Sequence, residues 1–349
     1  MNKAFGLTAG AFILWALASL AAAQTHNHWQ TQTVNTAANF RGLSVVGDVI
    51  WASGTGGVFV KTTNGGKTWR VGQVAGADQL DFRDVEAFGA PVAYLLSIGP
   101  GESSRIYKTT DGGDNWTMQF QNTEKEAFFD ALAFWDERHG LALSDPVRGR
   151  FYLVSTDDGG AHWIPVAPEG MPPAVSGEGG FAASGTCLIA RGKHDAWIVS
   201  GGTAARVFHS GDRGRTWAVV DTPILSGPAS AGIFSIAFAG EKEGLIVGGD
   251  YQKPEAIEKN AARTDDGGSS WRLVNTNAPT GFRSSVAFAT SGRSRTVLAV
   301  GTSGTDLSND GGLTWVSLDK ENFNSVAISN RRVAWAVGPK GHVARMVLQ

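Results

Sequence analysis

Arginine directly follows phenylalanine at three widely separated positions, which are Arg41, Arg83 and Arg283. The guanidinium group has forked donors that suit carboxylate or phosphate groups. If the fold brings the three together, they form an anion-binding site, to which Arg206 in an adjoining segment could contribute. The alternative is that these arginines form ion pairs and cap the ends of strands. Both interpretations stay open at this point.

Acidic residues between these arginines are the candidates for catalysis. They are Asp130, Asp145, Glu178 and Asp250, with Tyr251 beside the last of them. A pair of carboxylates can hydrolyse glycosides when the fold sets the pair at the right separation. No spacing in the sequence completes a catalytic signature, so no catalytic residue is assigned. Phosphate-binding loops and dinucleotide fingerprints are absent from the sequence, and we expect no cofactor and no metal.

A five-residue pattern repeats six times and indicates which elements position these residues. Ser or Thr, Asp or Asn, Gly, and a small polar residue or His stand seven, five, three and one positions before a Trp. The Asp or Asn positions are Asn64, Asp111, Asp158, Asp212, Asp266 and Asp310, and the Trp positions are Trp69, Trp116, Trp163, Trp217, Trp271 and Trp315. These residue types build a tight turn, because the side-chain oxygens accept main-chain N–H bonds and glycine permits positive φ. The pattern lacks the further ligands of a calcium loop.

The spacing of the repeat matches a propeller blade. Successive tryptophans are separated by 47, 47, 54, 54 and 44 residues, close to the length of a four-stranded blade. Three more strands are expected after the last box, at residues 323–328, 333–337 and 342–347, and the fourth strand of that blade is expected at 29–34. The sequence therefore predicts an all-β, seven-bladed propeller, closed by pairing of its N- and C-terminal strands.

The residues at 62–69, Thr-Thr-Asn-Gly-Gly-Lys-Thr-Trp, and at 334–338, Ala-Trp-Ala-Val-Gly, support a family resemblance. The chain resembles the BNR or Asp-box propeller superfamily and, within it, the seven-bladed photosystem II assembly-factor branch. That resemblance implies a non-catalytic scaffold that binds proteins. Sialidases and other glycosidases carry the same box, so the superfamily itself does not decide activity.

The first residues resemble a secretory leader. Lys3 precedes a largely apolar run from Phe5 to Leu20, and three alanines end at Ala23. We therefore expect a signal peptide at 1–23, one propeller domain at 24–349, and a periplasmic or secreted location. The formal net charge of -2 and the interspersed charges favour neither nucleic acid nor insertion into a membrane. The one cysteine, Cys187, leaves no intrachain disulfide, and we expect a monomer.

Strand order divides the predicted ring into two faces. The boxes decorate one face, while the loops between second and third strands and the links between blades gather on the other. Those loops are long in blades two to five, at 97–105, 144–150, 165–184, 200–206 and 248–261. Long loops on a rigid scaffold often carry binding residues. The first hypothesis is an exported scaffold that binds a protein segment there, and the alternative is a sialidase-like glycoside hydrolase that acts on an anionic glycan.

Overall fold

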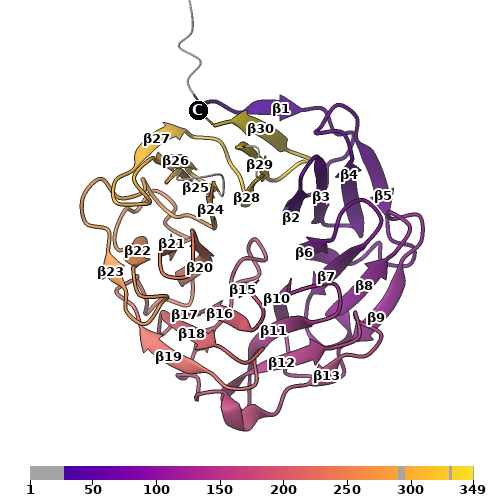
Figure 1. Ribbon diagram of the computed structural model, residues 1–349, viewed down its shortest axis with the longest axis horizontal. Coiled ribbons are helices and arrows are strands. Elements are labelled where there is room, and N and C mark those ends of the chain that lie inside the picture. The colour runs from indigo at the N-terminus through magenta and orange to yellow at the C-terminus, as the bar shows by residue number, and fades with distance from the viewer. Residues whose placement is uncertain (1–26, 290–294, 330–331, 349) are drawn as a thin grey trace, which may run out of the picture.

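Seven antiparallel sheets surround a central channel in the computed structural model (Figure 1), which describes residues 27–289, 295–329 and 332–348. The seven-bladed propeller is confirmed. Residues 1–23, interpreted as a leader, lie outside the described part of the chain. Within the described ranges, no helix has the length and apolarity needed to cross a membrane.

Each blade is a meander whose first strand lines the channel and whose fourth strand is outermost (Figure 1). Blade one contains β2 (Phe40–Val46), β3 (Val49–Gly54), β4 (Val58–Thr62) and β5 (Arg70–Gln73); blade two contains β6 (Asp81–Ala87), β7 (Ala93–Ile98), β8 (Arg105–Thr109) and β9 (Thr117–Gln121). Blade three contains β10 (Phe129–Phe134), β11 (Gly140–Val147), β12 (Arg150–Thr156) and β13 (Ile164–Pro165); blade four contains β15 (Leu188–Arg191), β16 (Asp195–Val199), β18 (Arg206–Ser210) and β19 (Ala218–Asp221).

The remaining blades follow the same order. Blade five contains β20 (Ala231–Phe238), β21 (Gly244–Asp250), β22 (Ala261–Thr264) and β23 (Arg272–Leu273); blade six contains β24 (Ser285–Phe288), β25 (Val297–Gly301), β26 (Gly304–Ser308) and β27 (Val316–Asp319). Blade seven contains β28 (Ser325–Ile328), β29 (Val333–Val337), β30 (Val343–Val347) and, from the other end of the chain, β1 (Gln30–Gln32). Two short 3-10 helices, η1 (Gly101–Ser103) and η2 (Pro168–Gly170), lie in loops.

Pairing of β1 with β30 closes the ring, as the sequence predicts. The two strands are antiparallel, with Thr31 opposite Ala344. The indole N–H of Trp29 donates to Thr305 Oγ1 at 2.9 Å, and its ring lies 5.0 Å from that of Phe323. The N-terminal strand thus joins blade seven and also contacts blade six. Closure gives blade seven the same four strands as the other blades, so that only short edges remain in the ring.

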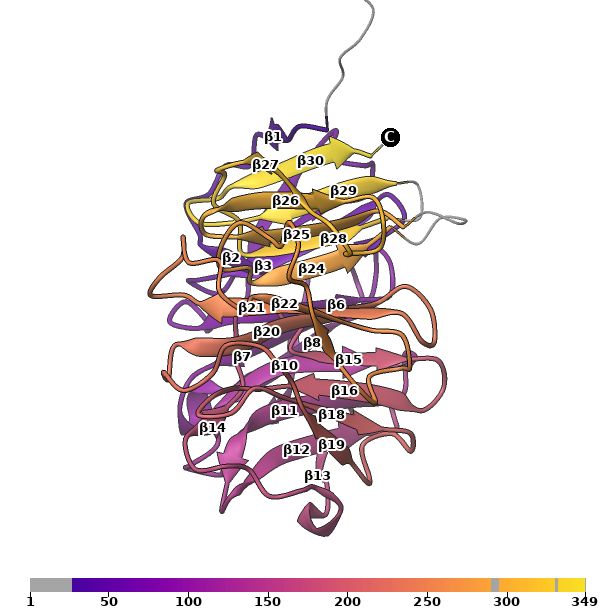
Figure 2. The ribbon, with the colours of Figure 1, turned by 90° about the vertical axis from the view of Figure 1, so that its left-hand side faces the viewer.

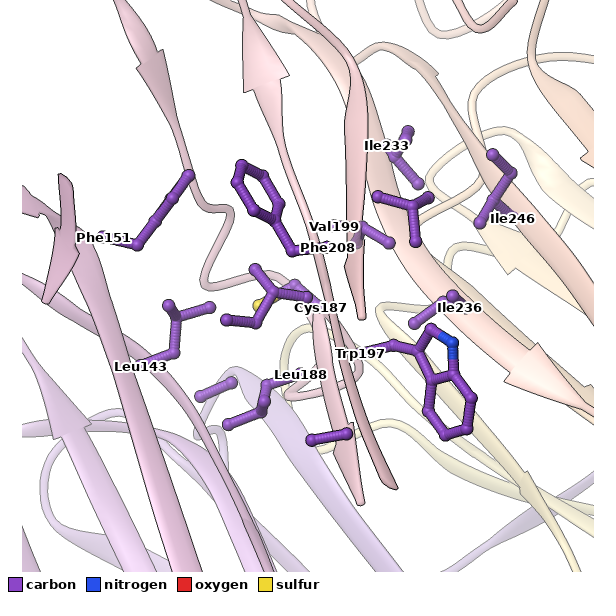
Figure 3. Packing of buried hydrophobic residues seen from close by; sticks show 14 of the residues in the cluster. Leu143, Phe151, Cys187, Leu188, Trp197, Val199, Phe208, Ile233, Ile236 and Ile246 are labelled. Carbon is purple, nitrogen blue, oxygen red and sulfur yellow. The ribbon is translucent and has the colours of Figure 1, made fainter. Parts of the chain in front are cut away.

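The core lies between neighbouring blades (Figure 3). The second strand of each blade is covered on both faces by the neighbouring blades. All seven residues of β21 and all five of β25 are therefore buried, and these strands do not alternate between buried and solvent-exposed residues. Figure 3 shows this packing where blades three, four and five meet, with Leu143, Cys187 and Trp197 among the buried side chains. Cys187 is a free, fully buried thiol.

The six boxes occupy the turns between third and fourth strands. In blade five, the Thr264 hydroxyl accepts from Gly268 N at 2.9 Å and donates to Asp266 Oδ1 at 2.7 Å. Asp266 also accepts from Ser270, through main-chain N–H at 3.0 Å and through the hydroxyl at 2.6 Å. The other boxes repeat this arrangement. We call this side of the ring the box face and the opposite side the mouth face; in Figure 2 the two faces lie at opposite ends of the horizontal strands.

Replacing Asp266 with alanine should destabilise the fold by about 1 kcal/mol, because the turn loses its acceptor. The hydrogen bonds, led by that of the Ser270 hydroxyl, lower the pKa of Asp266 to about 2 from 3.8. A depressed pKa means that the contribution is full above about pH 4 and is lost as the pH falls towards 2. Urea unfolding at pH 6 and pH 2.5 measures both effects, with the exposed neighbour Asp265→Ala as control. Equal stability of Asp266→Ala and Asp265→Ala at pH 6 would show that the box bonds contribute nothing.

Two details of the mouth face differ from the sequence-based expectation. Residues 144–150 were expected to be a loop, but β11 and β12 continue through Val147 and Arg150 and enclose a two-residue turn with positive φ at both Arg148 and Gly149. In addition, β14 (Glu178–Gly179) and β17 (Gly201–Gly202) extend the sheet of blade five to six strands. These strands are two residues long and glycine-rich, so their sequences carry no strand signal.

Candidate functional site

The mouth of the channel is filled by a segment of the chain itself, residues 180–186, which we call the plug. Figure 1 shows the segment before β15 reaching into the centre of the ring. Arg41 Nη1 donates to the Ala183 carbonyl at 3.2 Å, and Arg83 Nη1 donates to the Ala182 carbonyl at 3.1 Å. The two arginines therefore converge, as the sequence suggests, but they hold main-chain carbonyls of this chain.

Further contacts fix the plug to other blades. The Ser184 hydroxyl donates to the Ser284 carbonyl at 2.9 Å, and the N–H of Gly180 donates to Asp145 Oδ1 at 2.7 Å. Phe181 stacks on Phe234, with ring centres 3.8 Å apart. Blades one, two, three, five and six all contact the plug through these residues, so it closes the channel at the mouth face.

Buried carboxyl groups lie beneath the plug. Asp130 and Asp84 are 1% and 5% exposed. A methyl group on Gly180 would come within 2.6 Å of an Asp130 oxygen, and one on Gly185 would come within 2.2 Å of Asp84, so only glycine fits at both positions. Burial raises the pKa of Asp84 to about 7 and raises the pKa of Asp130 well above its ordinary value, with Asp145 adding to the second shift.

Arg283 does not join Arg41 and Arg83, which corrects the expectation that the three converge. Gly54 lies opposite Phe40 in blade one, but its counterpart in blade six, Gly301, lies against Arg283. Arg283 thus occupies the strand position that Phe40 occupies in blade one, where the side chain is buried in the core and does not face the channel. Its side chain is fully buried, and its Nε donates to Asp306 Oδ2 at 2.6 Å. A shift of one residue moves a side chain to the other side of a strand.

Arg206 is also engaged by an internal carboxylate and does not present a free guanidinium to a ligand. Its Nε donates to Glu178 Oε1 at 2.9 Å, and Glu178 accepts in addition from the Ser200 hydroxyl and from Val175 N. The Glu178 side chain is fully buried in this arrangement. Glu178 therefore anchors β14 rather than standing free for acid–base chemistry. Arg83 likewise pairs with Asp81 at 2.8 Å.

Of the four arginines, Arg41 has no carboxylate within ion-pair distance among the described residues. Burial first, and then the neighbouring Arg83, lower the pKa of Arg41 to about 10. Its guanidinium remains protonated at neutral pH and is directed at the plug. Arg41 and Arg83 thus both donate hydrogen bonds to main-chain carbonyl groups of the plug.

A cavity of about 580 Å³ opens on the mouth face beside the plug. The plug residues Gly180 and Phe181 line one side, the end of β11 with Asp145 lines another, and Gly201 and Gly202 of β17 line a third. Asp250 and Tyr251 lie at the end of β21. The Asp250 side chain is buried and accepts from Gln252 N at 3.0 Å, while Tyr251 is 48% exposed and meets Phe181 edge to face.

This arrangement is suited to binding. Main-chain groups of several glycines, an aromatic ring and carboxylates face one cavity, whereas Asp130, Glu178 and Asp250 are enclosed. Across the described ranges, no group of three His, Cys, Asp or Glu side chains is placed to hold a metal ion.

Comparison with known proteins finds a family model that matches about half of the chain. Residues 10–181 match the model described as photosynthesis system II assembly factor YCF48. This part of the chain is similar to the YCF48 family. The photosystem II assembly protein Ycf48 of Synechococcus sp. (strain JA-2-3B'a(2-13)) is 29% identical over 194 residues, which are 44% of this chain and 55% of that protein. The match thus spans about half the length of this curated relative.

Solved structures resemble this ring in fold. A YCF48 structure bound to D1 peptide has 18% identity and a TM-score of 0.66, covering 93% of this chain and 98% of that one. YCF48 from Cyanidioschyzon merolae has 17% identity and a TM-score of 0.65, covering 91% and 98%. The GH74 enzyme of Niastella koreensis has 14% identity and a TM-score of 0.61, covering 90% of this chain and 53% of that one.

Sequence reasoning named Asp130 as a candidate but missed the plug and the second buried acid beneath it, Asp84. The signal available was the glycine content of residues 177–185, with Gly177, Gly179, Gly180 and Gly185. Such a run permits close approach of main chain to side chains. The segment overlaps the end of the loop expected at 165–184 on the mouth face, but its entry into the channel depends on contacts with five other blades.

Proposed function

We propose that this propeller is an assembly-factor-like scaffold that binds an extended protein segment across its mouth face. The observation that carries the proposal is the cavity beside the plug, whose walls include Gly179, Gly180, Gly201 and Gly202. Because these residues have no side chains, a bound segment can approach the main chain closely, and the side chains around the cavity then give specificity.

The plug supports the same proposal. Two arginine side chains and a stacked phenylalanine hold the plug, and these groups recognise features that any peptide offers. A solved YCF48 structure, similar in fold, is described as bound to D1 peptide. Tyr251 and Val175, which are 48% and 45% exposed, add apolar surface near the cavity. Rigid aromatic side chains often dominate such contacts.

Replacing Tyr251 with alanine should weaken binding of a peptide about tenfold. The probes are a fluorescently labelled D1 peptide and a library of random octapeptides, measured by anisotropy. The matched control is Leu313→Ala, because Leu313 is 49% exposed but lies in a box turn on the opposite face. Thermal melting should be the same for both variants. Failure of the D1 peptide and of every library member to bind, or an equal loss in both variants, would reject the proposal.

A further inference from the structure

The charge lining the mouth cavity has one sign. Glu126, Asp145 and Glu178 are among the residues that line the cavity, and no lysine, arginine or histidine is. The Glu178 side chain itself is fully buried, so the carboxylates that charge the cavity are those of Asp145 and Glu126. The nearby cations are already paired: Arg206 with Glu178, and Arg148 with Glu124. Among the described residues, Asp145 and Glu126 have no ion-pair partner, so the cavity carries uncompensated negative charge.

The geometry at Asp145 leaves one of its oxygens available. Oδ1 accepts from the N–H of Gly180, whereas no hydrogen bond to Oδ2 is recorded in the described part of the chain. Directly below Gly180, Asp130 Oδ2 is buried with no hydrogen-bond partner. Two carboxyl groups therefore flank the same glycine, and neither receives a cation from this chain except for the more distant Arg83, whose charge acts on Asp130.

Apolar groups line the rest of the cavity. Phe181, Val175, Ala174, Ala229 and Pro146 supply aliphatic and aromatic surface beside the carboxylates. A lysine or arginine side chain combines an apolar stem with a cationic head, and it gains most where the stem packs against apolar surface and the head meets an anion. A neutral or acidic side chain would leave Asp145 without a counter-charge.

We infer that this cavity is a specificity pocket for a basic side chain, lysine or arginine, of the bound protein segment, with Asp145 as its principal anion. The inference rests on the proposed function, since it names the side chain that the segment presents. Glu126 is exposed and contributes long-range attraction, while Phe181 and Val175 contact the stem.

Titration of Asp145 provides a test of this assignment that does not depend on a peptide. Burial raises the pKa of Asp145, opposed by the hydrogen bond from Gly180. The groups around it are Asp130 below, Glu178 with its partner Arg206, Glu126 at the rim, and the Arg148–Glu124 pair beyond the hairpin turn. A cation bound beside Asp145 favours its charged form and should lower its pKa.

The test uses two small probes that differ in the terminal ammonium group, Nα-acetyl-lysine methylamide and Nα-acetyl-norleucine methylamide, which has the same four-carbon chain without that group. Carboxyl-detected NMR follows the pKa of Asp145 during each titration. The lysine probe should bind more tightly than the norleucine probe and should lower the Asp145 pKa. Asp145→Asn should weaken lysine-probe binding about tenfold, since a charge-assisted hydrogen bond is lost. The control Asp265→Asn removes an exposed aspartate of the box face and should change nothing.

Equal affinity of wild type for the two probes, or an unchanged affinity in Asp145→Asn, would overturn the pocket assignment. The octapeptide library separates this failure from failure of the proposed function. Enrichment of lysine or arginine at one position, lost in Asp145→Asn and kept in Asp265→Asn, supports the pocket. Selected peptides without a basic position would leave peptide binding standing and refute the pocket.

Discussion

Removal of residues through Val34 should open the ring and destabilise it by at least about 3 kcal/mol, comparable with the loss of one large core aromatic. The deletion removes β1 and so leaves the edge of β30 without its partner at Gln30, Thr31 and Gln32. It also removes the Trp29 contacts with Thr305 and Phe323. An exposed strand edge recruits other chains, so the shortened protein should also aggregate.

Chemical denaturation and light scattering measure these two effects. The matched control is a chain that starts at Asn27 and therefore keeps β1. A synthetic peptide of residues 27–36, added to the shortened protein, should restore stability by filling the vacant edge. Identical unfolding of the shortened and control chains would contradict the role of β1 in closing the ring.

Replacing Arg283 with alanine should cost about 3 to 5 kcal/mol, because it leaves a buried carboxylate without its counter-charge. Both side chains of the Arg283–Asp306 pair are fully buried. Arg283 also donates to the Ser303 hydroxyl at 3.0 Å and to the Thr280 hydroxyl at 3.0 Å, so one substitution breaks a network. Binding of a peptide to the folded fraction should be unaffected, since this side chain points into blade six.

Two controls distinguish a buried pair from general sensitivity. Arg295→Ala removes a half-exposed partner of Glu243, and it should cost less than about 1 kcal/mol. The double substitution of Arg283 by Met and Asp306 by Leu removes both charges and should recover much of the lost stability. If Arg283→Ala unfolds at the same urea concentration as Arg295→Ala, the buried pair contributes no more to the free energy of unfolding than the half-exposed pair.

The mouth-face loops explain why the site was predicted only in outline. The long segments at 165–184, 200–206 and 248–261 were identified on the correct face, and the cavity lies between residues of the first two. Their internal structure was not predictable, because β14 and β17 are two residues long and are held by pairing with each other and with β20. Such contacts join segments distant in the chain, and local propensity does not determine them.

The sequence by itself determined the number of blades, their boundaries and the closure of the ring. A turn pattern that recurs with blade-like spacing reports local hydrogen bonds, such as those of Asp266, and local bonds can be inferred from neighbours in the chain. Only the tertiary structure decided how the arginines and acids are used. Arg41 and Arg283 share the same dipeptide, yet a register difference of one residue directs the first at the plug and the second into blade six, because side chains alternate along a strand. The plug itself depends on five blades at once, and no window of sequence contains them.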